Sequence, residues 1–193
     1  NRFWEESVFA IADGYCVINL TKSIVRGSMY QVVNGKKYNL NEQLGLPENS
    51  SLQSLVDAWA LTIPEEGLKD FLHEFDRERL LNRFENGERH ISFRYWTRTA
   101  TFEPMLAEDH MALYREEKTG DVIAVNYVLD RTEHYRLEEK ERALEKSNRE
   151  YAKLLKEEKK HTAMIEELTK KLQSQLELFT VSIPGGVKIS NDD

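Results

Sequence analysis

A long stretch of charged sequence carries a seven-residue repeat, and this repeat limits the possible folds more than any other feature. Residues 133–180 contain neither glycine nor proline, and their eleven acidic and eleven basic side chains cancel in charge. The repeated positions are Leu137, Leu144, Tyr151, Glu158, Ile165, Leu172 and Phe179. A sustained apolar repeat of this period is the signature of a coiled coil. It predicts a long helix that pairs with a second copy of the chain; a solvated single helix is the alternative.

The predicted coiled coil is imperfect. Glu158 is the one charged residue in the repeat, and the companion stripe is polar in either register. One register places Glu141 and Asn148 in that stripe, and the other places Lys140 and Ser147 there. Two packings of such a helix pair lie close in energy, which is what a conformational switch requires.

The residues before this helix alternate between strand and helix patterns. Strands are expected at 15–20, 24–33, 90–97, 108–115 and 122–130, with 36–40 extending the first ribbon after the hairpin signal Asn34-Gly35. Helices are expected at 2–11, 52–60, about 64–75 and 77–85, with Ser50 or Ser51 and Asp76 as N-caps. The order predicts an α+β fold in which a five-stranded antiparallel sheet carries helices on one face.

Composition excludes several classes of function. The net charge of −7 argues against broad nucleic-acid binding, which needs a basic face. No apolar run reaches eighteen residues, so we expect no membrane-spanning segment. Cys16 is the only cysteine, so an internal disulfide is impossible, which fits a reducing cytoplasm.

Three local motifs, together with the order of elements, resemble the PAS family over about residues 5–133. His-Glu-Phe-Asp-Arg at 73–77 is similar to the His-Pro-Asp-Asp-Arg stretch that begins the last PAS helix, with Glu-Phe in place of Pro-Asp. Lys-Thr-Gly-Asp at 118–121 resembles the turn before the last PAS strand. Asp-Arg-Thr-Glu at 130–133 resembles the Asp-Ile-Thr-Glu motif that joins PAS domains to output helices.

The resemblance implies a sensory module from a bacterial multidomain signalling protein, of the GGDEF diguanylate cyclase or sensor kinase type. Residues 1–132 would be the PAS domain with an N-terminal helix, and 133–180 the signalling helix. Residues 181–193 would start a further domain, because Ile-Pro-Gly-Gly at 183–186 resembles the beginning of a second PAS domain. The alternatives are a ligand-free dimerisation spacer and the sensory fragment of a cyclase or histidine kinase whose catalytic domain lies outside this chain.

The resemblance also implies residue roles for signal transmission. Asp130 and Thr132 would tie the last strand to the helix, with Thr132 suited to be its N-cap. Glu158 would then keep the helix pair able to change its packing.

A possible small-molecule site follows from the same resemblance, because the inner sheet face lines the ligand cavity in PAS domains. The candidate ligand-binding residues are Phe93, Tyr95, Met111, Leu113 and Tyr127. Ordinary core packing of these side chains is the alternative.

Signatures of catalysis and of cofactor binding are missing from the sequence. The five histidines have no metal-ligand spacing, and His161 lacks the Glu and Pro of a phospho-accepting box. The Asn-Cys-Arg-Phe motif of flavin-binding PAS domains is missing, so we expect Cys16 to be buried and inert. No haem signature is present either, which leaves any cofactor unidentified. Glu108 and Asp109 are adjacent on a predicted strand and should point apart. We therefore expect no catalytic or metal-binding residue within this fragment.

Overall fold

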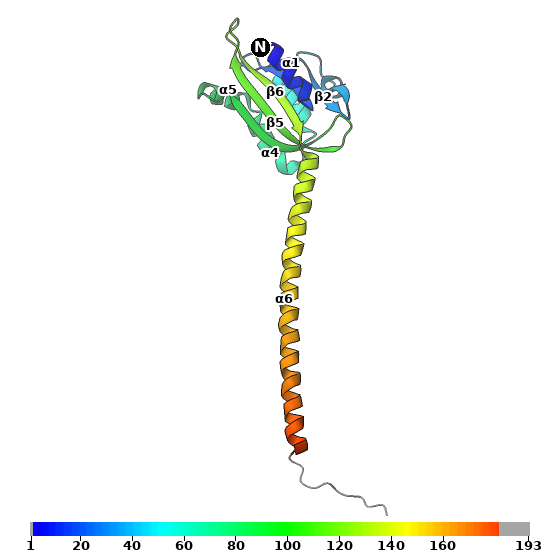
Figure 1. Ribbon diagram of the computed structural model, residues 1–193. Helices are drawn as coiled ribbons and strands as arrows, with labels where there is room; N and C mark the ends of the chain where they lie inside the picture. Colours follow the sequence, from blue (N-terminus) through cyan, green and yellow to red (C-terminus); the bar gives the residue numbers. More distant parts are fainter. Residues whose placement is uncertain (1, 182–193) are drawn as a thin grey trace, which may run out of the picture. The chain divides into compact units, whose positions relative to one another are not determined.

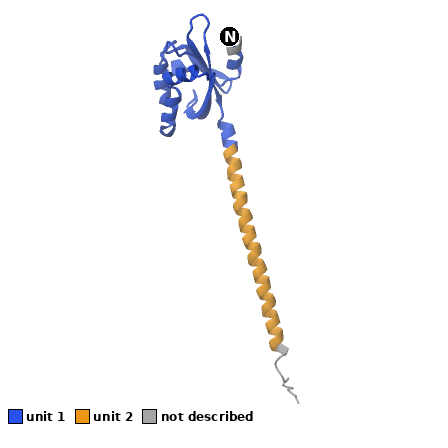
Figure 2. Ribbon diagram, turned by 90° about the vertical axis from the view of Figure 1, so that its left-hand side faces the viewer, with its two compact units in different colours: residues 1–137 blue, residues 138–193 orange. Residues whose placement is uncertain are grey.

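The computed structural model describes residues 2–181, with the side chains of residues 6–179. The chain divides after Leu137 into two units (Figure 2). The first unit contains α1 (Arg2–Ile11), β1 (Gly14–Asn19), β2 (Ile24–Val33), β3 (Lys36–Asn39), α2 (Leu40–Gln43), α3 (Leu52–Ala60), α4 (Glu65–Glu74), α5 (Arg77–Glu85), β4 (His90–Arg98), β5 (Pro104–Arg115) and β6 (Val122–Asp130). It also holds the first residues of α6 (Thr132–Val181), and the rest of that helix forms the second unit. The predicted start of a further domain lies outside the described residues, apart from the last residue of α6.

The first unit is built on one antiparallel sheet with the strand order β3-β2-β1-β6-β5-β4. Strands β5 and β6 of this sheet lie side by side in Figure 1. The first and last long strands, β1 and β6, are therefore neighbours in the middle. Helices α2 to α5 lie between β3 and β4 in the chain, and the main core forms between these helices and one face of the sheet. We call this the inner face. The predicted PAS-like α+β fold is confirmed, but the sheet has six strands and not five.

The sixth strand follows from the turn at Asn34-Gly35. Both residues have positive φ, at 50° and 76°, which is the backbone that a tight type I′ hairpin turn needs. The chain therefore folds straight back, and β3 pairs with β2 as a strand of its own. The strand predicted at 108–115 also begins earlier, at Pro104, because proline is tolerated as the first residue of a strand.

The helices over the inner face begin at their local capping signals. The Ser51 hydroxyl accepts a hydrogen bond from the Ser54 amide at 3.0 Å, and the Asp76 carboxylate accepts one from the Arg79 amide at 2.7 Å. Their apolar faces bury Leu52, Leu55, Val56, Trp59, Phe71, Leu80 and Phe84. Burial of each such side chain contributes roughly 1.5–3 kcal/mol, and this holds the helices on the sheet.

Helix α1 packs on the opposite, outer face of the sheet. The Phe9 ring stacks on Tyr15 with the ring centroids 4.1 Å apart. Tyr15 is the cross-strand partner of Tyr127, so both side chains lie on this outer face.

The second unit is a single uninterrupted helix. Its described side chains from Glu139 to Phe179 are all exposed, including the apolar members of the seven-residue repeat and Glu158. Three i,i+4 pairs form ion contacts along the helix: Arg142 with Glu138, Arg149 with Glu145 and Lys171 with Glu167. Among the described residues, no helix has the length and apolar character needed to cross a membrane.

Candidate functional site

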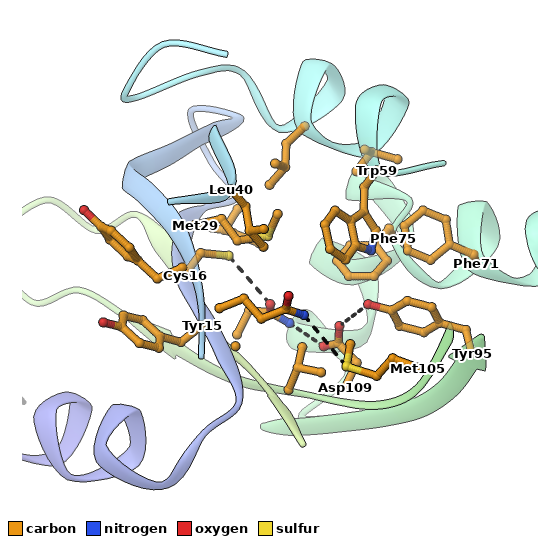
Figure 3. A pocket seen from close by; sticks show the side chains of 18 residues that line it. Tyr15, Cys16, Met29, Leu40, Trp59, Phe71, Phe75, Tyr95, Met105 and Asp109 are labelled. Atoms are coloured by element: carbon orange, nitrogen blue, oxygen red, sulfur yellow. Dashed lines mark hydrogen bonds between the residues drawn. The ribbon is translucent and has the colours of Figure 1, made fainter. Parts of the chain in front are cut away.

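A small cavity lies between the inner face of the sheet and helices α2, α3 and α4. Four aromatic side chains, Trp59, Phe71, Phe75 and Tyr95, form much of its wall (Figure 3). Its volume is about 30 Å³, which is room for one or two water molecules. Typical small-molecule sites measure about 300–1,000 Å³. A flavin or haem therefore does not fit unless the helices move away from the sheet.

A buried polar cluster borders this cavity and joins four strands. The Tyr95 hydroxyl of β4 donates a hydrogen bond to the Asp109 carboxylate of β5 at 2.9 Å. The side-chain amide of Asn126, on β6, donates to the other Asp109 oxygen. The Cys16 thiol of β1 in turn donates to the Asn126 carbonyl oxygen at 3.6 Å. Asp109 is only 1% exposed, so these contacts replace the water that an ordinary carboxylate would have.

Burial determines the protonation of this cluster. It raises the pKa of Asp109 to about 7, although the hydrogen bonds from Tyr95 and Asn126 act in the opposite direction. Burial, followed by the nearby charge of Asp109, also raises the pKa values of Tyr95 and Cys16. Cys16 therefore stays a protonated thiol, which is a poor nucleophile. No lysine, arginine or histidine is among the described residues that line the cavity, so Asp109 has no positive partner there.

The structure brings only part of the predicted ligand-binding set to this cavity. Tyr95 lines it, and Phe93 stacks beside Tyr95 with ring centroids 5.4 Å apart. Met111 and Leu113 belong to the core on the inner face but do not line the cavity.

Tyr127 was assigned to the wrong face of the sheet. It points to the outer face, where its ring stacks on His110 with centroids 4.8 Å apart. The inward residues of β6 include Asn126 and Val128, and both line the cavity. Strand β6 is apolar on both faces, so alternation along it did not distinguish the inner from the outer side.

Asp109 and Asn126 are the site residues that the sequence analysis missed. Glu108 and Asp109 do point apart, as expected, but the inward one belongs to the polar cluster. The alternation along β5 could have identified Asp109. It is the one charged side chain among the five inward positions of this strand, and the other four are Met105, Ala107, Met111 and Leu113. A polar residue at an inward position of a core strand needs a partner.

The junction between β6 and α6 is tied to the neighbouring strand. The Asp130 carboxylate accepts hydrogen bonds from both the amide and the hydroxyl of Thr132, the amide at 2.9 Å. The Thr132 hydroxyl also accepts from the Leu106 amide at 2.9 Å, and the Arg131 amide donates to the Leu106 carbonyl at 2.9 Å. Thr132 is thus the first residue of α6 and not its predicted N-cap, and Asp130 satisfies its amide.

The same junction is held from the other side by the loop between α1 and β1. The Asp130 amide donates to the Asp13 carboxylate at 2.7 Å, and the Asp13 amide donates to the Val128 carbonyl at 2.9 Å. Asp13 therefore connects the start of the first strand to the end of the last.

A carboxylate on the outer face adds a third contact to the junction. Glu108 binds Arg131 at 3.0 Å, His110 at 3.1 Å and also Arg94. Burial alone would raise the pKa of Glu108, but the hydrogen bonds from Arg131, Arg94 and His110 outweigh it and lower the pKa to about 2. Glu108 is therefore ionised at neutral pH and holds Arg131 beside β5.

Over the described part of the chain, His, Cys, Asp and Glu side chains form no group of three that could hold an ion.

No family model and no curated protein matches the chain. One similar solved structure is a sensory box histidine kinase/response regulator from Burkholderia thailandensis, with 18% identity, a TM-score of 0.42, and 77% of this chain and 98% of that chain covered. Another is the N-terminal domain of a diguanylate cyclase with PAS/PAC sensor from Marinobacter aquaeolei, with 14% identity, a TM-score of 0.39, and coverages of 63% and 97%. The PAS-like description of this chain rests on its own order of elements, with strands before and after a helical middle and a long helix at the end.

Proposed function

We propose that this chain is a sensory signal-transduction module. In this proposal a ligand or partner acts on the cavity at the inner face, and the change passes through β6 into a dimeric α6. The observation that carries the proposal is that strand β6 both lines the cavity and leads directly into α6. Strand β6 lines the cavity with Asn126 and Val128 and ends at Asp130, whose carboxylate binds the Thr132 amide at the start of α6.

The contacts supply a physical route for the change. Asn126 is bonded to Asp109 and Cys16, so a molecule that competes for any of these groups pulls on β6. The far end of β6 is held by Asp13 and, through Thr132, by Leu106. A shift of the strand therefore reaches the first turn of α6 without crossing any mobile segment.

The exposed repeat on α6 supports a homodimer in the proposed mechanism. Apolar residues such as Leu144, Ile165 and Leu172 are more than half exposed on the single helix. A helix of 50 residues is about 75 Å long, and pairing in a coiled coil would bury this stripe. We infer that an output domain of the diguanylate cyclase or kinase class follows in the full-length protein, and that the module works in the cytoplasm.

Disulfide crosslinking across α6 tests the proposal in the whole chain. With Leu144→Cys as the reporter, we expect Asn126→Leu, which disrupts the cavity cluster, to change the crosslinking rate between two copies. Asn82→Leu on the exposed face of α5 serves as the matched control and should leave the rate unchanged. Cys16 needs no replacement because it is buried and protonated. Equal rates in all three proteins would contradict transmission and favour the ligand-free spacer.

Glu158→Leu should lock the helix pair. The substitution replaces the one charged member of the repeat, so we expect a higher melting temperature of the coiled coil by circular dichroism and a weaker response to Asn126→Leu in the crosslinking assay. Glu166→Leu is the control, since Glu166 lies on the outer side of the helix in the register that places Lys140 and Ser147 in the companion stripe. Unchanged melting and unchanged response would remove Glu158 from the mechanism.

A further inference from the structure

A second hollow lies outside the cavity, between α4 and the edge strand β4. This groove has a volume of about 500 Å³, which is within the usual range for a small-molecule site. Phe71 and Tyr95 line both the groove and the inner cavity, and their ring centroids are 5.0 Å apart. These two rings are thus a shared wall, and Tyr95 is also the residue that holds Asp109 (Figure 3).

Three carboxylates and one cation line the groove, and the cation, Arg94, is paired with Glu108. Glu66, Asp70 and Glu74 follow each other at four-residue spacing, so they share one face of α4, and all three line the groove. Glu74 is paired with Arg79 and Arg83 at 2.9 and 3.1 Å. Among the described residues, Glu66 and Asp70 have no ion-pair partner. Their uncompensated charge attracts cations to the groove.

The inner cavity holds a buried carboxylate that has no cationic partner among the lining residues. An ionised carboxylate buried without a cation is costly, and Asp109 has only the neutral donors of Tyr95 and Asn126. Aromatic rings such as Trp59 and Phe75 stand around it, and their faces attract cations. An anion would find no countercharge at this site, and a neutral molecule would leave the carboxylate uncompensated.

We propose that the groove and cavity together form a site for a small primary ammonium ligand with an apolar body. The ammonium group occupies the cavity beside Asp109, which has room for one or two heavy atoms. The body lies in the groove, and the rings of Phe71 and Tyr95 separate to admit it. This inference names the ligand class of the proposed sensory module and rests on that proposal.

Calorimetric titration of the whole chain tests the ligand class with three matched probes. Phenethylamine carries the cation, 2-phenylethanol is its neutral counterpart, and phenylacetate is the anion. At constant ionic strength we expect the amine to bind at least about tenfold more tightly than either of the others, since one buried ion pair is worth more than about 1.4 kcal/mol. Asp109→Asn should remove this preference, whereas Asp57→Asn, an exposed aspartate on α3, should retain it.

The pH dependence gives a second readout. Between pH 6 and pH 8 amine binding should strengthen by about tenfold, because Asp109 ionises with a pKa of about 7. The other groups that face Asp109 do not titrate in this range: burial raises the pKa values of Tyr95 on β4 and Cys16 on β1, and the amide of Asn126 on β6 is neutral. The helices contribute only aromatic and aliphatic side chains to the cavity.

The outcomes separate this inference from the sensory role. Equal binding of amine and alcohol, full amine affinity in Asp109→Asn, or no binding of any probe would each overturn the ammonium ligand. The sensory role would still stand if Asn126→Leu changes crosslinking across α6. If crosslinking is unresponsive but the amine binds selectively, the site exists without the proposed transmission.

Discussion

Asp109→Asn should stabilise the folded domain at pH 8 by up to about 4 kcal/mol and change its stability little at pH 4. Burial raises the pKa of Asp109 from 3.8 to about 7, and each pKa unit corresponds to about 1.4 kcal/mol. Between these two pH values the folded state binds more protons at this group than the unfolded state does. The contribution of Asp109 to the stability of the wild-type domain is therefore fully present below about pH 4 and is lost as the pH rises through 7. Asparagine keeps the size of the side chain and removes the ionisation.

Chemical unfolding at pH 4, 6 and 8, followed by tryptophan fluorescence, measures this effect. The wild-type and Asp109→Asn curves should converge at pH 4 and separate at pH 8. The gain stays below its upper value because the Asn126 amide, which now donates to a carboxylate, must find another acceptor. Asp57→Asn provides the control for a lost surface charge. Parallel stability profiles for wild type and Asp109→Asn would show that the buried carboxylate is not ionised in the folded domain.

Thr132→Val should destabilise the domain by about 1–3 kcal/mol and loosen the junction between β6 and α6. Valine has nearly the same shape, but it cannot accept the hydrogen bond from the buried Leu106 amide or donate to Asp130. Leaving a buried amide without an acceptor costs about 1–3 kcal/mol. Because the same hydroxyl joins strand β5 to the start of α6, the substitution should also weaken the crosslinking response to Asn126→Leu.

Hydrogen exchange resolves where the Thr132→Val effect occurs. We expect faster exchange of the Leu106 and Thr132 amides, with little change in the core of β6 around Val125. Thr169→Val is the matched control, since that hydroxyl is exposed and bonds only to the Ile165 carbonyl of its own helix. Unaltered exchange at Leu106 would mean that the hydroxyl does not hold the strand to the junction.

Local signals account for most of what the sequence could predict about the fold. Asn34-Gly35, Ser51 and Asp76 each act within a few residues, and each marks a turn or a helix start in the structure. The predicted number of strands is wrong because residues 36–39 form a separate strand that pairs with β2. Their extended conformation is nevertheless the one that the sequence predicts.

The site was harder to predict because it depends on register between strands that are distant in the sequence. Cys16 meets Asn126 across 110 residues, and no local pattern contains that pairing. The sequence predicts Tyr127 as core because it is an aromatic residue on an apolar strand, and Asn126 does not enter the predicted set. Only the sheet register shows that Asn126 faces the same side as Asp109 and Tyr95.

The hydrogen bonds between Asp13 and the end of β6 influence how the sheet responds to a pulling force on the chain. Strands β1 and β6 are antiparallel neighbours, with Gly14 opposite Val128, so the first strand begins where the last one ends. A pull applied between the start of β1 and the end of β6 therefore loads one pair of residues at a time, and the strands peel apart from this end. The two hydrogen bonds that join Asp13 to β6 are the first to carry that load. The sheet therefore resists force least when the chain is pulled between the start of β1 and the end of β6.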